Sequence, residues 1–161
     1  MIHASQNVTM IPKLRSARAA DLAAIERLLA VAELESTGVA ELMARQAGDV
    51  IVVDDDARSA EVVGVAALEV CGEDALLRSV AVHPEWRQRR LGHALVRHVM
   101  DEANDRGLRA LYLLTITAEH FFPKLGFERI DRDAVPIGIA GTHEFQSMCP
   151  ASAIAMVRAL R

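Results

Sequence analysis

The feature that most constrains the fold is a strand pattern followed by a helix pattern and then a second strand pattern. Residues 75–82 (ALLRSVAV) are mostly apolar, and this run ends at His83-Pro84. Apolar residues then recur at helical spacing from Gly92 to Arg106, and Gly107 ends the helix. Arg109 to Thr117 (RALYLLTIT) is again strand-like. A strand, a helix and a second strand in this order predict a crossover between two parallel strands.

Two further strand-like runs precede this crossover. They are Val50 to Val53 and Glu61 to Val70 (EVVGVAALEV), and the turn residues Cys71-Gly72-Glu73-Asp74 link the second run to Ala75–Val82. A turn between two strand-like runs indicates a hairpin, so these strands are expected to pair antiparallel. Together with the parallel crossover, they predict a mixed sheet.

The remaining elements complete the predicted order. A helix begins near Asp21, with apolar residues at 22, 25, 28, 29 and 32 on one face. The other expected elements are a strand at 10–16, helices at 38–46 and Ala118–Leu125, and strands at 127–131 and Ser152–Leu160. The predicted class is α/β (α+β). Its mixed, mostly antiparallel central sheet has six to seven strands, flanked on both faces by about four helices.

Length and composition are those of a globular domain. The 161 residues fit one domain, and 52 % are hydrophobic and 25 % charged. No apolar run approaches the roughly 20 residues of a membrane span, and the start of the chain lacks the features of a signal peptide. We therefore expect a cytoplasmic protein with no membrane partner. Met10 offers a second start site, so residues 1–9 are expected to form a flexible extension before one domain over 10–161.

The turn before the central helix is strongly basic. Arg87, Arg89 and Arg90 precede Gly92 and the helix pattern. One interpretation is a phosphate site, because the first turn of a helix offers free N–H groups and partial positive charge. The alternatives are a solvated surface turn and a nucleic-acid contact. The formal net charge of −4 argues against a general nucleic-acid binder and favours a small partner.

The stretch Ser79 to Leu95 (SVAVHPEWRQRRLGHAL) resembles the acetyl-CoA-binding motif of the GNAT family of N-acetyltransferases. That family shows a strand of the type L-x-V-x-P, then R/Q-x-x-G-x-G/A, then a helix. The matching residues are Val80, Val82, Pro84, Arg87 and Gly92. Arg90 stands where the first glycine is usual, and Gln88 where a glycine is common. Position 90 is expected to need a backbone angle that Arg adopts less readily than Gly.

A second element of the same family follows at the right distance. Ala118 to Phe127 (AEHFFPKLGF) resembles A-x-x-F-Y-x-K-x-G-F. The matching residues are Ala118, Phe121, Lys124, Gly126 and Phe127. Phe122 stands where the family often has the Tyr that protonates the leaving thiolate, and Phe has no proton to donate. The two elements cover about residues 76–130.

The resemblance implies acetyl-CoA as the cosubstrate and an acyltransferase reaction on an amine. Backbone groups of the central strand would pair with the pantetheine arm, and the Arg-rich turn and helix start would hold the diphosphate. The cofactor-binding residues that it implies are Val80, Ala81, Val82, Arg87, Gln88, Arg89, Arg90, Leu91, Gly92, His93, Thr115, Phe121, Phe122 and Lys124. A backbone N–H near Val82 would face the thioester carbonyl.

Two residues are the candidates for chemistry at the acceptor. Arg78 interrupts an apolar strand, where its guanidinium could take a carboxylate or an oxyacid group; the alternative is an outward-facing surface residue. Glu69 is the candidate general base, and a solvated strand carboxylate is its alternative. Glu119 and a water chain are other routes for the proton. Further residues expected to line the same cleft are Thr115, Thr117, Thr142, Glu144 and Phe145.

The tail resembles a narrower group. Thr142 to Ala153 (THEFQSMCPASA) and Gly64 to Val82 are similar to N-acetyltransferases encoded with arsenic-resistance genes. The resemblance implies a small, amino-acid-like or toxic amine as acceptor, in arsenic resistance. Family members often dimerise, so the resemblance leaves a homodimer as one of the expected oligomeric states.

Metal chemistry is not expected. The histidines have no metal-ligand spacing, and the two cysteines, Cys71 and Cys149, form no C-x-x-C. The rival function is a protein that binds CoA without turnover, or that senses a metalloid through these two thiols.

Overall fold

The computed structural model describes residues 13–36, 38–46, 50–55, 61–147 and 153–161. Seven strands in this part of the chain form one sheet in the order β1-β2-β3-β4-β5-β7-β6. All neighbours pair antiparallel except β4 and β5, which are parallel. The strands are β1 (Leu14–Ser16), β2 (Val50–Asp55), β3 (Glu61–Cys71), β4 (Asp74–Val82), β5 (Ala110–Thr115), β6 (Glu128–Ile130) and β7 (Ile154–Ala159). The predicted mixed, mostly antiparallel sheet is confirmed.

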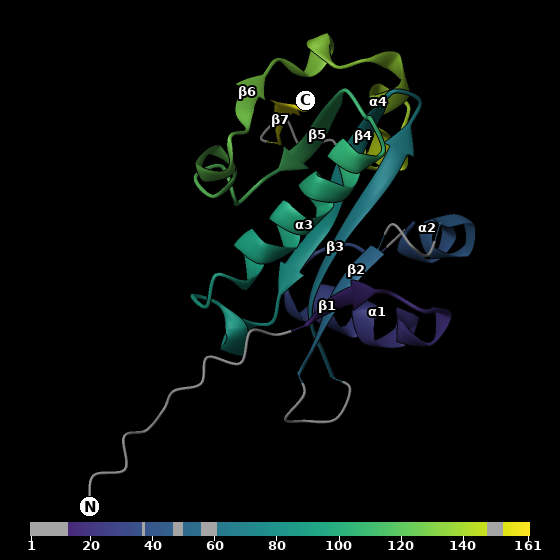
Figure 1. Cartoon of the computed structure of the whole chain (residues 1–161), viewed down its shortest axis with the longest axis vertical. Coiled ribbons are helices and arrows are strands. Elements are labelled where there is room, and N and C mark those ends of the chain that lie inside the picture. The colour runs from purple at the N-terminus through teal and green to yellow at the C-terminus, as the bar shows by residue number, and fades with distance from the viewer. Residues whose placement is uncertain (1–12, 37, 47–49, 56–60, 148–152) are drawn as a thin grey trace, which may run out of the picture.

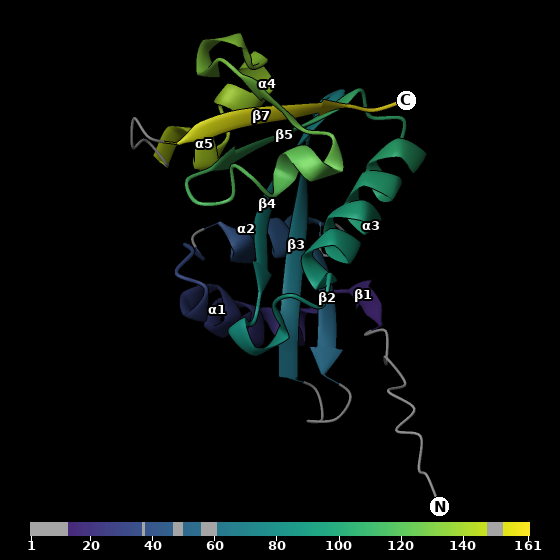
Figure 2. The ribbon, with the colours of Figure 1, turned by 90° about the vertical axis from the view of Figure 1, so that its left-hand side faces the viewer.

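The helices cover both faces of this sheet (Figures 1 and 2). The α-helices in the described residues are α1 (Leu22–Val31), α2 (Val39–Gln46), α3 (Leu91–Asp105), α4 (Ile137–Ala140) and α5 (His143–Ser147). Helix α3 lies on one face, while α1 and α2 lie on the other (Figure 2). Helices α4 and α5 lie on the same side as α2, against the end of the hairpin formed by β3 and β4.

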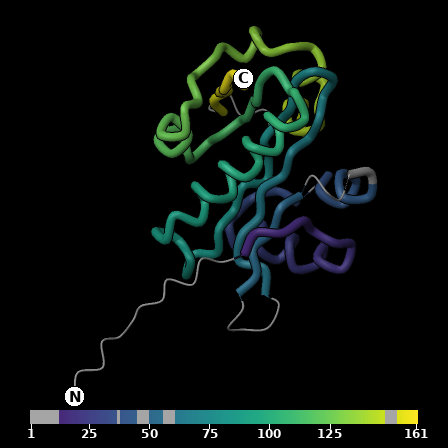
Figure 3. Tube along the Cα trace, in the orientation of Figure 1, coloured from purple at the N-terminus to yellow at the C-terminus, as the bar shows by residue number. Residues whose placement is uncertain are grey.

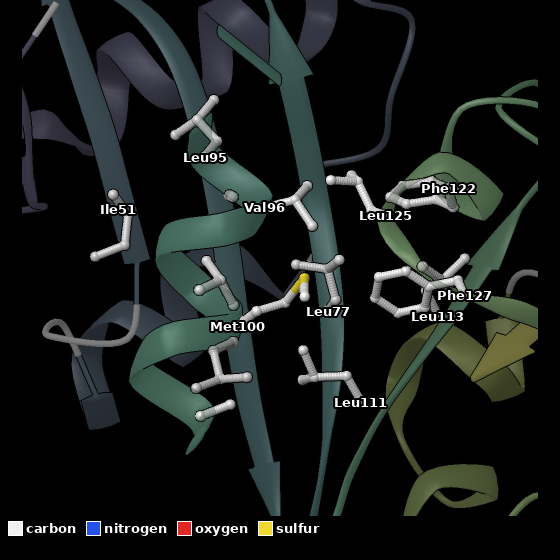
Figure 4. Close-up of a cluster of buried hydrophobic side chains, with 14 of the residues drawn as sticks. Ile51, Leu77, Leu95, Val96, Met100, Leu111, Leu113, Phe122, Leu125 and Phe127 are labelled. Atoms are coloured by element: carbon white, nitrogen blue, oxygen red, sulfur yellow. The ribbon is translucent and has the colours of Figure 1, made fainter. Parts of the chain in front are cut away.

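The largest apolar cluster fills the space between α3 and the sheet (Figure 4). Leu95, Val96 and Met100 project from α3 at i, i+1 and i+5, the spacing of one helical face. They pack with sheet residues such as Leu77 and Leu111. A second cluster lies between the sheet and α1 and α2, and a third under α4 and α5. The crossover helix is therefore anchored by burial, and this fixes where its first turn lies.

A β-bulge interrupts β4. Val65 pairs with Ala81 and Ala67 with Arg78, so two steps along β3 match three steps along β4. Ser79 has φ +56 at this point, a left-handed angle that a regular strand does not contain. Strands β4 and β5 pair only at Ala75↔Leu111 and Leu76↔Tyr112 among the described residues. After the bulge, β4 therefore has backbone groups on its β5 side that no ladder pair with β5 satisfies.

The last strand of the chain is an interior strand of the sheet. The chain leaves β5, forms β6, crosses the end of the molecule through α4 and α5, and returns as β7 (Figure 3). Strand β7 lies between β5 and β6 and pairs antiparallel with both. The sheet order is therefore not the sequence order at this end.

One helix prediction was wrong, and two short helices were not predicted. The expected helix at Ala118–Leu125 is a turn followed by the 3-10 helix η5 (Phe122–Leu125). Pro123 explains the difference, because its ring would clash with the carbonyl of Glu119 in an α-helix. Helices α4 and α5 were not predicted; each spans about one turn, too short for an apolar period to be visible. The other 3-10 helices among the described residues are η1 (Ala19–Asp21), η4 (Pro84–Trp86) and η6 (Arg132–Ala134).

Candidate functional site

The basic turn enters α3 through two left-handed residues. Gln88 has φ +68, and Arg90, at the N-cap of α3, has φ +59 and ψ +18. These are the two positions where the family commonly has glycine, so the expected unusual angle at Arg90 is confirmed. Residues other than Gly adopt this conformation at a cost of about 1–2 kcal/mol. The turn keeps its shape although neither residue is a glycine, and it brings the first N–H groups of the 15-residue helix to the surface.

Three separate segments meet at Gly92. A Cβ added at Gly92 would lie 3.3 Å from Cζ of Phe121 and 3.8 Å from Cγ2 of Val82. The ring of His93 meets the Phe121 ring edge-on, with centroids 5.1 Å apart. The end of β4, the first turn of α3 and the segment before η5 are thus in contact. We call residues 80–93 together with Phe121 the cofactor side of the molecule.

The arginines of the turn have different environments. Nε of Arg87 donates to the carbonyl of Val82 at 3.3 Å, which fastens the turn to the end of β4. The guanidinium of Arg89 lies over the Trp86 ring, 4.7 Å from its centroid. All four side chains from Arg87 to Arg90 are exposed. Two of the arginines therefore order the turn through their own contacts, and the turn concentrates positive charge beside the N-terminus of α3.

Other predicted cofactor residues lie partly in the core. Leu91 and Phe122 are buried in the cluster under α3, and Ala81 is buried in the cluster under α1 and α2. Phe122 meets Phe127 edge-on at 5.6 Å, inside the cluster under α3. Oγ1 of Thr115 accepts the N–H of Ala118 at 3.0 Å and fixes the turn after β5. Val80 and Val82 pack on the same core and are partly exposed.

Lys124 lies beside residues from the middle of α3. It lines an open groove of about 360 Å³ between α3 and η5, together with Arg97 of α3 and Arg158 of β7. Nη1 of Arg158 donates to the carbonyl of Leu125 at 2.9 Å and so holds η5 against β7. Contact between Lys124 and the cosubstrate stays a prediction.

The predicted acceptor residues meet on the opposite face of the sheet. Nη1 of Arg78 donates to Oε1 of Glu69 at 3.1 Å, across the β3–β4 hairpin. Arg78 keeps only 6 % of its surface exposed, so the alternative of an outward-facing surface residue is wrong. The pair lies between the apolar cluster under α1 and α2 and the one under α4 and α5. The charge of a buried guanidinium is costly unless an anionic group forms hydrogen bonds with it.

Gly38, directly before α2, was not predicted as part of this site. A Cβ at Gly38 would lie 3.2 Å from Nη2 of Arg78, and Gly38 has φ +88. The lack of a side chain therefore lets the backbone approach the guanidinium. In the sequence, a glycine before a helix pattern signals only a turn, so nothing there indicates this contact.

Glu144 of α5 interacts electrostatically with the same pair. Its Oε2 is buried and has no hydrogen-bond partner among the described residues. Burial raises the pKa of Glu144 to about 7; the charge of Arg78 opposes this shift and the charge of Glu69 adds to it. We call Glu69, Arg78 and Glu144 the acceptor side. The predicted neighbours Thr142 and Phe145 shape α5: Oγ1 of Thr142 donates to the carbonyl of Ile139 and accepts the N–H of Phe145.

Other predicted groups lie outside these two sites. Glu119 and Thr117 are exposed, and Glu119 has His120 within 3.5 Å. Cys71 is in no disulfide within the described residues, and its Sγ donates to the carbonyl of Glu69 at 3.5 Å, whereas Cys149 lies outside the described residues. No cluster of three or more His, Cys, Asp or Glu suited to a metal ion occurs in the described part of the chain. None of the helices described combines the length and apolarity of a membrane span.

Solved structures share this fold over nearly the whole chain. Rv2747 from Mycobacterium tuberculosis, in complex with CoA and NLQ, is 27 % identical with a TM-score of 0.74; the match covers 93 % of this chain and 100 % of that one. N-acetylglutamate synthase from Neisseria gonorrhoeae, complexed with coenzyme A and N-acetyl-glutamate, is 21 % identical with a TM-score of 0.77, over 92 % of this chain and 35 % of that one. The second likeness is evidence for the fold alone.

Curated relatives match about half of the chain. The amino-acid acetyltransferase of Vibrio cholerae serotype O1 is 32 % identical over 87 residues, which are 53 % of this chain and 20 % of that protein. The amino-acid acetyltransferase of Aeromonas salmonicida is 34 % identical over 82 residues, 50 % of this chain and 19 % of that protein. The matched segment thus spans about a fifth of the length of these relatives.

A family model identifies the segment that contains the cofactor side. The model of the acetyltransferase (GNAT) domain matches residues 46–129, just over half of the chain. This match confirms the predicted family. The arsenic-resistance group and the assigned role of each site residue stay predictions. The chain belongs to the acetyltransferase (GNAT) domain family.

Proposed function

We propose that this chain transfers the acetyl group of acetyl-CoA to the amine of a small, amino-acid-like acceptor that carries an acidic group. One observation carries the choice of acceptor: Arg78 is a buried cation on the face opposite α3, just after the last ladder pair that joins β4 to β5 in the described residues. A guanidinium in that place suits a carboxylate or an oxyacid bidentately. The names of the curated relatives, amino-acid acetyltransferases, support the same class.

The residues of the cofactor side fit acetyl-CoA. A Cβ at Gly92 would fit tightly against Phe121, at 3.3 Å, and the free N–H groups of Gly92 and His93 suit a diphosphate. The exposed arginines 87, 89 and 90 add positive charge beside them. The backbone of β4 after the bulge has unmatched groups for the pantetheine arm. When bound, acetyl-CoA supplies the thioester that acetylates the amine.

Departure of the thiolate does not require a tyrosine at position 122. Phe122 is buried in the core and has no proton to give. A thiol with a pKa of about 8.5 is a fair leaving group without an acid. The predicted N–H near Val82 would stabilise the developing oxyanion, a contribution of about 2.7–4 kcal/mol for one such donor in known enzymes.

The finer form of the proposal concerns a toxic acceptor. Similarity of Thr142–Ala153 to acetyltransferases encoded with arsenic-resistance genes supports an amino-acid analogue with an oxyacid group. The described part of that segment includes α5, which packs at the acceptor side. The cytoplasmic location, the homodimer and the domain range 10–161 stay predictions beside it.

Calorimetry with acetyl-CoA tests the cofactor side first. The wild-type chain should bind acetyl-CoA at micromolar concentration, and Gly92→Trp should abolish binding because the indole would fill the space at the helix start. Release of the CoA thiol with L-glutamate, L-aspartate and phosphinothricin then tests the acceptor class, with L-lysine for comparison. Faster release of the CoA thiol with the acidic amines than with L-lysine supports the proposal. Binding of acetyl-CoA without turnover of any acidic amine contradicts it.

A further inference from the structure

Glu144 has a buried carboxyl oxygen that nothing in the described structure satisfies. A buried oxygen without a hydrogen-bond donor is costly, and a buried carboxylate more so. Thr142, two residues earlier, already donates to the carbonyl of Ile139, so it offers no proton to Glu144. The cost persists in the free protein, which points to a ligand that supplies the missing donor.

The charges around Glu144 come from two strands. Glu69 of β3 and Arg78 of β4 are the groups that act on its ionisation, and Glu69 is the partner of Arg78 at 3.1 Å. Arg132 approaches α5 elsewhere, where Nη2 donates to the carbonyl of Phe145. The acceptor side thus presents one cation, already held by one carboxylate, and a second carboxylate with a free oxygen. An amino acid presents the complementary pair, a carboxylate and an ammonium group.

We propose that Glu144 binds the ammonium group of the acceptor and takes its proton, while Arg78 binds the acceptor's carboxylate and Glu69 positions Arg78. This inference rests on the proposed function, because it assumes an amine acceptor with an acidic group. It reassigns the predicted base from Glu69 to Glu144. Glu69 already accepts a hydrogen bond from the guanidinium and would have to give it up to accept a proton there. Oε2 of Glu144 accepts no hydrogen bond from the described residues.

The proton and electron balance is simple. The ionised carboxylate of Glu144 takes one proton from the ammonium group and leaves a neutral amine. The nitrogen lone pair forms the bond to the thioester carbonyl carbon, and the carbon–sulfur bond breaks with its electron pair on sulfur. The second proton lost by nitrogen goes to that sulfur and gives the free thiol. Glu144 then returns its proton to water.

The raised pKa of Glu144 matches this role. A carboxyl group with a pKa near 7 is ionised in much of the population at neutral pH and is a stronger proton acceptor than an ordinary carboxylate. Above pH 7 the group is ready to accept a proton, and below pH 7 it becomes protonated. The rate with an acidic amine should therefore fall as the pH drops through about 7.

Two probes that differ by the amine separate the roles. Calorimetry in the presence of CoA compares L-glutamate with glutarate, which has both carboxylates but no ammonium group. Wild type should bind L-glutamate more tightly than glutarate. In Glu144→Gln the ratio of the two affinities should fall by about tenfold or more, as expected for losing a charge-assisted hydrogen bond. Glutarate should bind Glu144→Gln at least as tightly as wild type. Glu69→Gln should weaken both probes, since it acts through Arg78.

Kinetics provide the second readout. In Glu144→Gln, kcat with L-glutamate should fall and the loss of rate below pH 7 should disappear. Glu128→Gln, which removes an exposed carboxylate on β6, is the matched control and should behave as wild type. An unchanged preference for L-glutamate together with an unchanged pH profile in Glu144→Gln overturns this inference alone. Absence of turnover of every acidic amine tested, in wild type that binds acetyl-CoA, counts against the proposed function itself.

Discussion

The cofactor side and the acceptor side use different parts of the chain for recognition. On the cofactor side, backbone geometry dominates: left-handed Gln88 and Arg90, the free N–H groups of α3 and the close packing at Gly92. On the acceptor side, buried charged side chains dominate, and they come from β3, β4 and α5. A site built from backbone tolerates side-chain changes, whereas a site built from buried charges does not. The comparison thus predicts opposite sensitivities to mutation.

The largest effect is expected for Arg78→Met. This change leaves Glu69 without its cation in a place where both side chains are largely buried. Loss of one partner of a buried ion pair costs about 3–5 kcal/mol in the free energy of unfolding, which urea denaturation measures. The double variant Glu69→Gln/Arg78→Met should recover most of that loss. A loss below about 1 kcal/mol would instead mean that water screens the pair as it does at a surface.

A smaller, pH-dependent effect is expected for Glu144→Gln. The pKa of Glu144 is about 7 in the folded chain, above its ordinary value of 4.5. Between these values the folded state holds a proton that the unfolded chain has released, so stability falls as the pH rises. The variant removes this fall. It should be more stable than wild type at pH 8 by at most about 3 kcal/mol, with little difference at pH 4. Equal urea midpoints at pH 8 would show that Glu144 is well solvated.

The smallest effect is expected for Arg90→Gly on the cofactor side. Glycine adopts φ +59 without the clash of a Cβ, so the variant should gain about 1 kcal/mol in the free energy of unfolding. Acetyl-CoA binding should be retained, because the N–H groups stay in place. Arg89→Gly is the matched control; it loses the contact with Trp86 and gains no relief of strain. Loss of acetyl-CoA binding in Arg90→Gly would mean that the side chain, rather than the backbone, holds the ligand.

The same division explains how far the sequence alone leads. The crossover, the order of the strands along the chain and the turn before α3 could be predicted, because apolar periodicity and a contiguous motif carry them. The angle at Arg90 followed from a glycine expected at that position. The bulge at Ser79 could not be predicted, since Arg78 and its neighbours are compatible with a regular strand. Pro123 was present in the sequence as a helix breaker, but the predicted helix ran through it.

The acceptor side shows why some sites escape prediction. Glu69, Arg78 and Thr142–Phe145 could each be proposed as cleft residues, because charged and polar groups stand out near apolar runs. Their mutual arrangement could not, because Glu144 lies 66 positions after Arg78 in the chain. It reaches the pair only once the sheet has formed and α5 has packed on the hairpin. Gly38 gave no chemical signal at all, because its contribution is the absence of a side chain.

The position of β7 has a consequence for folding. Ile154 pairs with Thr115, and Ala155 with both Leu114 and Ile130, so β7 joins two strands that have no other ladder between them in the described sheet. Until β7 inserts, β5 exposes the open edge of an apolar strand, ALYLLT, to other chains. Pairings this far apart in sequence form slowly. The interval before β7 docks is thus the period in which a newly made chain is most open to aggregation.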